Sequence, residues 1–384
     1  MLVTLGVVVA VLVGVFYVAG GWYFAGRIQS GGLHLDVSTG VPAYDLQVTA
    51  VTPTSVTLTA PDGAPTAFTQ PSNYSLMWDG GSAHVGAVSV PSDATEVTRP
   101  LSDVIGTPLT VGTKVALERD WYLEDPKASL GLDFSTVQIA TPLGIMPAWY
   151  VPASGTTWAV MVHGKGGLRR EFLRTIPLVH AAGMPALVIT YRNDAGNPQD
   201  PDPRFGYGAT EWPDLEMAVD YATAHGAAKV LIYADSMGAS VTAAYLQHSD
   251  HVPAMTAMVF DAPMLSFEDA VDLGASRTSI PVVGLPVPSS LTWVAKQIAG
   301  RQYGIDWAAL DYASDTSWVT VPVLVLHGAA DPTAPVTTSE RFAAANPGTV
   351  RLEEFAAAAH MESWNTDRAR YEALVAPFLA AHTT

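Results

Sequence analysis

The chain has 384 residues, room for about two domains, and its formal net charge is −17, with 19 basic against 36 acidic residues. A nucleic acid or an anionic membrane surface would require a basic patch, so this charge argues against both as partners. The chain has no cysteine, which excludes disulfides, thiolate metal sites and cysteine nucleophiles.

Residues 1–26 are predicted to form a membrane anchor or a signal segment. Leu2–Ala19 is almost wholly apolar, aromatic residues follow, and the first charged side chain is Arg27. This length suits a transmembrane helix of about 20 residues, with the aromatic side chains at the interface. A cleavable signal peptide is the alternative; the basic leader is missing, although Val18-Ala19-Gly20 resembles a cleavage site. We favour an uncleaved anchor with the bulk of the protein outside the cytoplasm, and secretion after cleavage as the alternative.

Residues 27–131 are predicted to form a small antiparallel β domain, because their apolar residues alternate with polar ones between turn signals. A spacer or shield is the favoured role, and substrate guidance by Trp78, Trp121 and Tyr122 is the alternative. No metal-ligand spacing is found in this region. The alternating stretches are 45–51, 55–59, 82–90 and 114–119.

Residues 132–384 show strands and helices in alternation, which indicates a parallel sheet covered by helices on both faces. Two β-prone stretches between 133 and 152 suggest a hairpin, and 157–162 is a continuous apolar strand. That strand ends at His163-Gly164-Lys165-Gly166-Gly167. The order of residues does not fit a phosphate-binding loop, which would require Gly-x-x-x-x-Gly-Lys-Ser/Thr.

The central feature is Ala234-Asp235-Ser236-Met237-Gly238, between an apolar strand and a segment of helical composition. It nearly matches the small-x-Ser-x-Gly turn that holds a serine in a strained conformation at the end of a strand. On this motif residues 132–381 resemble the α/β-hydrolase family. The first glycine of the family pattern is Ala234 here, which adds a methyl group where strand and helix cross.

The resemblance implies roles for individual residues. Ser236 would be the nucleophile, and the backbone N–H groups of Lys165 and Met237 would form the oxyanion hole. His163 is interpreted as structural. The acid is assigned to Asp331, in a His-Gly-x-x-Asp turn after the strand 321–326, with Asp261 as the second candidate.

His360 follows a further strand, 350–355, and is the expected base, so the order Ser236, Asp331, His360 agrees with the family. Residues 263–317 are too long for an ordinary connection, and insertions at this point form a lid in the family. A packed helical excursion without a gating role is the alternative. The expected architecture is therefore an α/β-hydrolase fold with a lid insertion, preceded by a small all-β domain and a transmembrane helix.

The function that the resemblance implies is cleavage of small-molecule or lipid carboxylic esters through an acyl-enzyme, with no metal or organic cofactor. An envelope acyltransferase with the same three residues is the first alternative. The second is an inactive membrane-tethered binding protein of hydrolase fold. A peptidase with a β-propeller is disfavoured because the amino-terminal region is too short for one. The oligomeric state and the natural substrate stay open.

Overall fold

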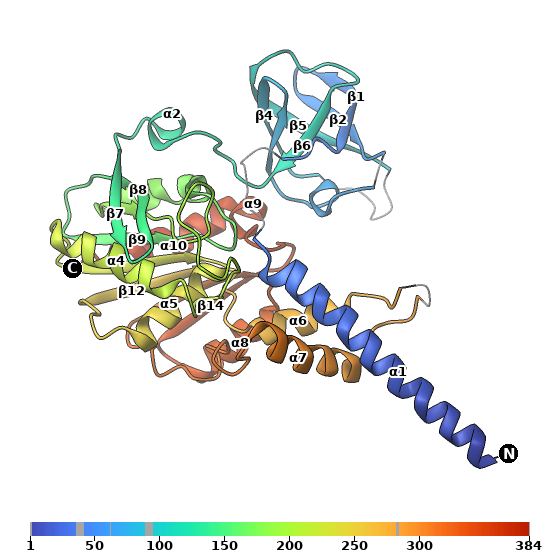
Figure 1. Cartoon of the computed structure of the whole chain (residues 1–384). Coiled ribbons are helices and arrows are strands. Elements are labelled where there is room, and N and C mark those ends of the chain that lie inside the picture. The colour runs from blue at the N-terminus through green and yellow to red at the C-terminus, as the bar shows by residue number, and fades with distance from the viewer. Residues whose placement is uncertain (1, 36–41, 62, 89–94, 282–283, 384) are drawn as a thin grey trace.

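The computed structural model describes residues 2–35, 42–61, 63–88, 95–281 and 284–383. They form an apolar helix, a β-barrel and a sheet flanked by helices (Figure 1). Some predicted features lie partly outside the described residues: Met1 of the segment 1–26, the end of the strand 82–90, Asp62 of the turn that Pro61-Asp62-Gly63 predicts, and Val282 and Val283 of the predicted lid.

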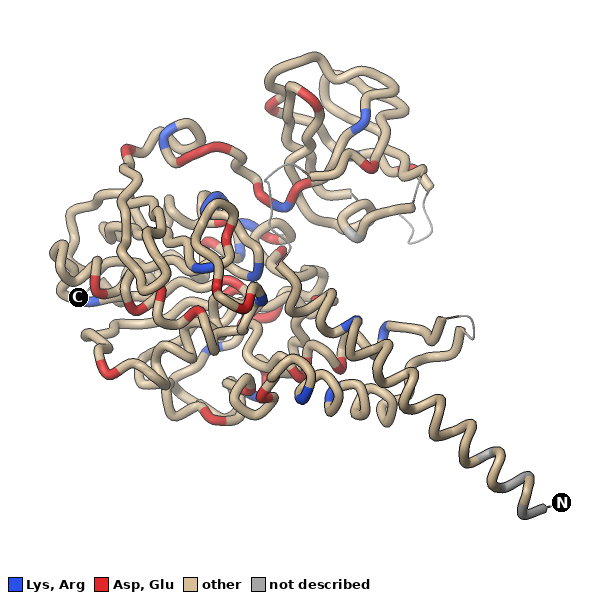
Figure 2. Tube along the Cα trace, viewed as in Figure 1, with Lys and Arg blue, Asp and Glu red and all other residues tan. Residues whose placement is uncertain are grey.

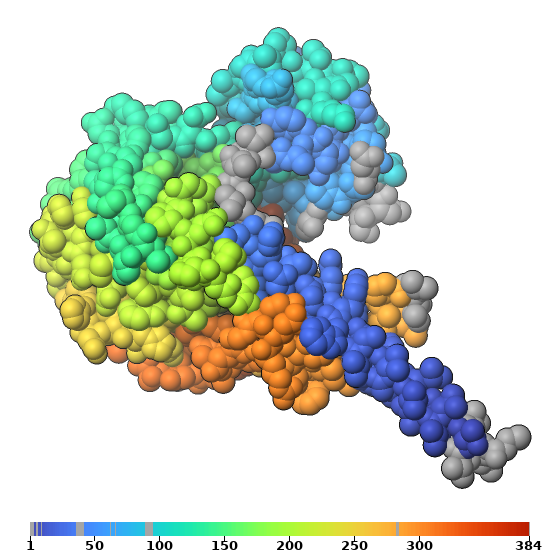
Figure 3. Space-filling view, in the orientation of Figure 1, coloured from blue at the N-terminus to red at the C-terminus, as the bar shows by residue number. Residues whose placement is uncertain are grey.

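The amino-terminal helix α1 covers Leu2–Ile28 and continues into a short π-helical turn, Gln29–Leu33. The stretch Ala10–Leu33 is long and apolar enough to span a membrane, a test that a signal sequence near the amino terminus would also pass. The amino-terminal half of α1 projects beyond the rest of the molecule, and its tube carries no charge colour (Figures 2 and 3). The predicted apolar helix is thus present.

Within the described residues, β1 to β6 close into an antiparallel barrel in the order β1-β2-β5-β4-β3-β6. The prediction of a small antiparallel β domain is confirmed, but β3 and β5 were missed. β3 is buried on almost every residue and so does not alternate, whereas β5 contains Pro100 and several charged residues. The strands are Leu46–Thr52, Ser55–Thr59, Tyr74–Trp78, Gly81–Val85, Glu96–Gly106 and Lys114–Glu118.

Arg99 of β5 is fully buried in the barrel. Its Nη1 donates to the carbonyl oxygens of Ser72 and Gly86, and its Nη2 donates to three carbonyl oxygens of the segment 67–70. Burial lowers the pKa of Arg99 to about 10, so the guanidinium is charged at neutral pH. This side chain therefore holds together the segment 67–72 and the end of the loop at Gly86.

Replacing Arg99 with methionine should destabilise the barrel by at least about 3 kcal/mol, because several buried carbonyl oxygens would lose their donors. Hydrogen exchange of barrel amides in the full-length protein measures this locally. Arg351→Met is the matched control, since Arg351 is 59% exposed and pairs with Glu353 at the surface; it should change stability by no more than about 1 kcal/mol. Equal exchange rates in both variants would contradict the structural role of Arg99.

The rest of the chain forms an eight-stranded sheet in the order β14-β13-β12-β11-β9-β10-β8-β7, as far as the structure describes it. β7 and β8 form the predicted antiparallel hairpin, and β9 to β14 run parallel. The predicted mostly parallel sheet is thus confirmed. The strands are Ser135–Thr141, Gly144–Val151, Thr157–Val162, Ala186–Val188, Lys229–Asp235, Met255–Asp261, Val323–Gly328 and Val350–Phe355.

Helices cover both faces of this sheet, as the continuous apolar strands require. On one face α4 (Trp212–Ala224), α5 (Met237–His248) and α8 (Val336–Ala345) contribute to one hydrophobic cluster. On the other face the 3₁₀ turn Arg169–Arg174, α3 (Ile176–Ala181) and α10 (Arg368–Ala381) contribute to another. The short helices are Thr66–Phe68 (3₁₀), α2 (Pro126–Leu130) and α9 (Ser363–Thr366).

The long segment between β12 and β13 contains α6 (Phe267–Ser276) and α7 (Ser289–Tyr303), within the predicted insertion 263–317. α7 lies beside α1, and Tyr17 Oη and Ser290 Oγ are 2.8 Å apart (Figure 1). The insertion is therefore packed against the amino-terminal helix.

Candidate active site

Ser236 lies on the turn between β11 and α5, with φ 50° and ψ −116°. This is the left-handed region that a residue with a side chain rarely adopts, and such strain is typical of functional turns. A Cβ on Gly238 would lie 2.1 Å from the carbonyl oxygen of Val162, so that position requires glycine. Ala234 is fully buried in β11 and accommodates the extra methyl group.

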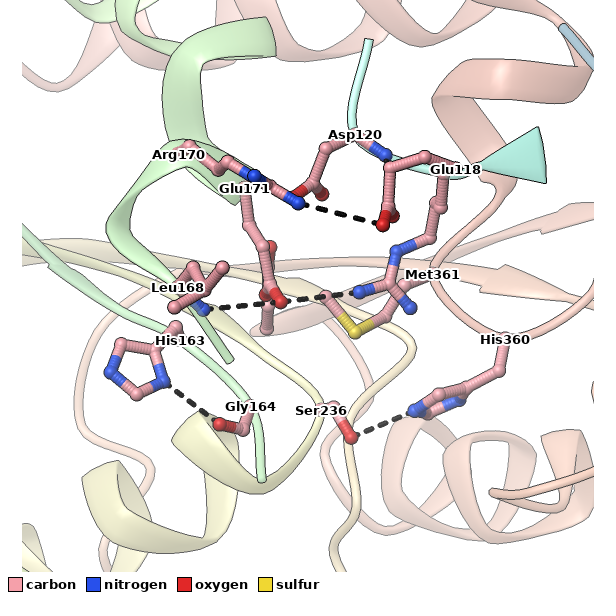
Figure 4. A network of polar contacts seen from close by, with 12 residues as sticks. Glu118, Asp120, His163, Gly164, Leu168, Arg170, Glu171, Ser236, His360 and Met361 are labelled. Carbon is pink, nitrogen blue, oxygen red and sulfur yellow. Dashed lines mark hydrogen bonds and ion pairs between the residues drawn. The ribbon is translucent and has the colours of Figure 1, made fainter. Parts of the chain in front are cut away.

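The structure brings Ser236, His360 and Asp331 together. Ser236 Oγ lies 2.8 Å from Nε2 of His360, and Nδ1 of His360 lies 2.7 Å from Oδ2 of Asp331. Ser236 and Asp331 are buried, and the His360 side chain is 15% exposed. Figure 4 shows the serine hydroxyl directed at the imidazole. A hydroxyl, an imidazole and a carboxylate in this order can relay a proton from the hydroxyl to the ring.

Asp331 is held by a turn that closes around it. Its Oδ1 accepts hydrogen bonds from the backbone N–H groups of Thr333 and Ala334, at 2.7 and 2.9 Å. His327 Nε2 lies 3.2 Å from Oδ2. Burial would raise the pKa of Asp331, but the hydrogen bonds from His327 and His360 outweigh it and hold this pKa well below its usual range. Asp331 is therefore ionised at neutral pH.

His327 is a contributor that the sequence reasoning did not assign. It is fully buried at the end of β13, and its Nδ1 lies 2.8 Å from Ser339 Oγ on α8. Ser339 can thus donate to Nδ1 and leave the proton of His327 on Nε2, which faces Asp331. The signal in the sequence was the histidine of the His-Gly-x-x-Asp turn itself.

Asp261, the second candidate for the acid, lies elsewhere. It ends β12 and accepts a hydrogen bond from Tyr371 Oη at 3.0 Å, and it pairs with Arg174. Arg174 also pairs with Asp235, the residue before the serine. Burial raises the pKa of both Asp235 and Asp261, while Arg174 opposes this shift. Asp261 therefore belongs to a buried charge cluster beneath the serine turn.

The residues proposed for the oxyanion hole line one cavity with Ser236 and His360. This cavity has a volume of about 180 Å³, and Lys165, Met237 and Gly164 are among its walls. A Cβ on Gly164 would lie 2.9 Å from Cβ of Ser236, so the loop passes close to the serine. The Lys165 side chain leaves the cavity, because its Nζ donates to the carbonyl oxygen of Gly31 at 2.9 Å. The loop thus passes closest to the serine at Gly164, and the amine of Lys165 is bound at Gly31.

The end of the barrel also reaches this cavity, which the sequence reasoning did not predict. Arg119 directly follows β6 and lines the cavity, and its Nη2 lies 3.2 Å from Oε1 of Glu171. Arg170 connects the same two parts of the chain through Asp120, at 2.7 Å, and Glu118 (Figure 4). The two parts are thus joined by ion pairs at the edge of the site.

His163 is fully buried and does not contact Ser236 or Asp331 through any described hydrogen bond. Its Nε2 lies 2.9 Å from Asp194 and its Nδ1 lies 2.8 Å from the carbonyl oxygen of Gly164. Burial would lower the pKa of His163, but the charge of Asp194 and its hydrogen bond raise it to about 9. The imidazolium therefore fixes the loop that carries Lys165.

This raised pKa predicts a loss of stability at alkaline pH. The folded-state pKa of about 9 lies above the unfolded value of 6.5, so the contribution is complete below the unfolded pKa and disappears as the pH rises through the folded one. We expect the free energy of unfolding to fall by about 3 kcal/mol across this window. Denaturant titrations over the pH range measure it. Asp194→Asn should flatten this dependence and His225→Gln, at an exposed histidine, should keep it; an unchanged slope in Asp194→Asn would contradict the assignment.

The described residues around Ser236 do not include a set of side chains suited to bind a metal ion. Among the described residues, no group of three or more histidine, aspartate or glutamate side chains is arranged to hold a metal ion.

We compared the chain with protein families, with curated proteins and with solved structures. A family described as a domain of unknown function, DUF8805, matches residues 47–118, from β1 to β6. No curated protein matches the chain significantly. An esterase of Pyrococcus furiosus is similar in structure, with 16% identity and a TM-score of 0.52, over 68% of this chain and 97% of that one.

A second crystal form of the same Pyrococcus furiosus esterase gives 19% identity and a TM-score of 0.51, over 68% of this chain and 95% of that one. An α/β hydrolase from a Penicillium species has 17% identity and a TM-score of 0.49, over 66% of this chain and 99% of that chain. At sequence identities this low, structural similarity is evidence for a shared fold and not for a shared activity. The sheet of β7 to β14 with helices on both faces, together with the likeness to the Pyrococcus furiosus esterase, shows that this part of the chain has the α/β-hydrolase fold.

Proposed function

We propose that the protein is a serine hydrolase that cleaves carboxylic esters through an acyl-enzyme. The observation that carries this proposal is the continuous hydrogen-bond chain from Ser236 Oγ through His360 to Asp331 on a strained turn. The esterase among the structural neighbours supports the same reaction class. Fold alone would not decide it, because this fold hosts many activities.

In the first half of the reaction, Ser236 Oγ attacks the ester carbonyl carbon while His360 Nε2 takes the hydroxyl proton. The negative charge on the carbonyl oxygen is stabilised by the N–H groups of Lys165 and Met237, each worth roughly 3 kcal/mol in related sites. The bond between the carbonyl carbon and the alcohol oxygen then breaks, and His360 returns the proton to that oxygen. Asp331 stabilises the imidazolium throughout.

In the second half, His360 takes a proton from water and the resulting hydroxide attacks the acyl carbon. The bond to Ser236 Oγ breaks, His360 returns the proton to Oγ, and the carboxylic acid leaves. This sequence restores the enzyme and uses no cofactor.

We further propose that residues 1–26 anchor the protein in a membrane, that 27–131 and 132–384 are separate domains, and that the catalytic part lies outside the cytoplasm. The apolar helix supports the first point, although a signal sequence would have the same composition. Protease accessibility in intact cells, with the mass of the recovered chain, tests the side of the membrane and the retention of α1.

Labelling of the full-length protein with a fluorophosphonate tests the proposed function. The reagent should modify Ser236, and peptide mass spectrometry locates the modified residue. Absence of labelling, in protein shown to be folded, would instead support the inactive binding protein. Competition between water and added alcohol for the acyl group then separates a hydrolase from an acyltransferase.

A further inference from the structure

A second cavity lies between α1 and the helices of the insertion. Its volume is about 340 Å³, within the range of about 300–1,000 Å³ that is usual for small-molecule sites. Most of its walls are apolar or small side chains. They include Phe24 and Ile28 of α1, Phe267, Ala270 and Val271 of α6, and Ala295 of α7.

This cavity shares part of its wall with the cavity of the serine. Tyr207, Met264 and Thr333 line both. Pro332 and Thr333, which follow Asp331 directly, also lie in the wall of the apolar cavity. The two cavities are therefore neighbours, and an apolar chain in the larger one would lie beside the reacting centre.

The π-helical turn Gln29–Leu33, which continues α1, is fixed to the catalytic part by specific contacts. The carbonyl oxygen of Gly31 accepts from Lys165 Nζ, and that of Gly32 accepts from Tyr207 Oη at 2.9 Å. A Cβ on Gly32 would lie 2.8 Å from the ring of Phe267. Lys165 belongs to the loop beside Ser236, so α1 is attached to the site at the loop that would bind the oxyanion.

The middle of α1 packs closely against α7. A Cβ on Gly21 would lie 2.7 Å from Cγ1 of Val294, and one on Gly20 would lie 3.1 Å from Cδ1 of Leu291. Small residues allow such close approach of helices in membranes. Leu285 and Trp293 of the insertion are each 60% exposed. Trp293 belongs to α7, the helix that packs against α1.

We propose that the apolar cavity binds the acyl chain of a membrane lipid ester, and that α1 is a wall of this substrate site as well as an anchor. The inference rests on the proposed function, because it requires an ester carbonyl at Ser236. An acyl chain is the occupant that fits, since most of the lining is apolar or small and part of the wall is shared with the cavity of the serine. The insertion and α1 together then receive the chain from the bilayer.

A matched pair of glycine variants tests the cavity. Gly274 of α6 lines it and Gly26 of α1 does not, and a Cβ on either would meet no atom within 4 Å. In full-length protein in detergent micelles, Gly274→Leu should lower kcat/KM for p-nitrophenyl palmitate about tenfold, the contribution of roughly two buried methylene groups. It should leave kcat/KM for p-nitrophenyl acetate within about twofold, and Gly26→Leu should leave both values within about twofold.

Ile28→Trp tests the part played by α1, because it narrows the cavity from that side. It should reduce palmitate turnover selectively, as Gly274→Leu does. Equal loss for both esters in Gly274→Leu, or no loss for either, would overturn the acyl site. A selective loss in Gly274→Leu without one in Ile28→Trp would overturn the role of α1. Failure of the proposed function is distinct, because wild-type protein would then hydrolyse neither ester and resist fluorophosphonate.

Discussion

Replacing Ser236 with alanine should abolish turnover of p-nitrophenyl acetate, with a loss of about a million-fold in kcat by analogy with other serine nucleophiles. The hydroxyl is the group that forms the covalent bond, and its removal leaves the loop of Lys165 and the rest of the cavity in place. Ser236 Oγ is 2.8 Å from the imidazole, so no other rearrangement is needed for proton transfer. Steady-state rates of the purified full-length protein measure the effect.

Ser249→Ala is the matched control, because Ser249 caps the opposite end of the same helix α5 and contacts Glu216 away from the site. It should keep turnover within about twofold of wild type. Circular dichroism of both variants shows whether the fold is kept. Substantial turnover in folded Ser236→Ala would mean that another group carries the reaction, and the proposed mechanism would fail.

The parallel sheet could be predicted because its strands are buried on both faces. The segment 157–162 is apolar at nearly every position, and all of β9 is buried in the structure. The strands of the barrel were harder to predict from the sequence. Charged residues and Pro100 interrupt the β-strand pattern of β5, and β3 does not alternate between apolar and polar residues. Periodicity detects half-buried strands and long buried ones, and it misses short strands that a neighbouring element covers.

Some residues of the candidate site could likewise be predicted from the sequence, and others could not. Ser236, Asp331 and His360 could be placed because each follows its own strand at the same edge of the sheet. Arg119 and Arg174 could not, because their partners lie 52 and 61 residues away in sequence and depend on how the separate parts pack. The hydrogen bond between Lys165 and Gly31, just after α1, could not be predicted either, because it joins residues 134 positions apart in the sequence. The apolar pattern of α1 suits a simple anchor equally well.

Asp331→Asn should lower kcat for p-nitrophenyl acetate by about 10⁴-fold, as the loss of the acid does in other such arrangements. The carboxylate accepts the Nδ1 proton of His360 at 2.7 Å, which leaves Nε2 free to accept the proton of Ser236. An asparagine side-chain amide can present its N–H there and favour the wrong tautomer, and it no longer stabilises the imidazolium. The measurement is kcat across the pH range in which wild type is active.

Asp261→Asn tests the other candidate for the acid, because Asp261 ends β12 and Asp331 lies in the turn after the neighbouring strand β13. The pKa of Asp261 is raised by burial, so a neutral amide is a mild replacement there, and its partners are Tyr371 and Arg174. We expect kcat of folded Asp261→Asn to stay within about tenfold of wild type. The reverse order, a severe loss at Asp261 and a mild one at Asp331, would show that the imidazole of His360 turns to the other carboxylate during catalysis. The low pKa of Asp331 argues for the order expected here, because a carboxyl that stays ionised far below neutral pH is available to hold the imidazolium at every pH where the serine reacts.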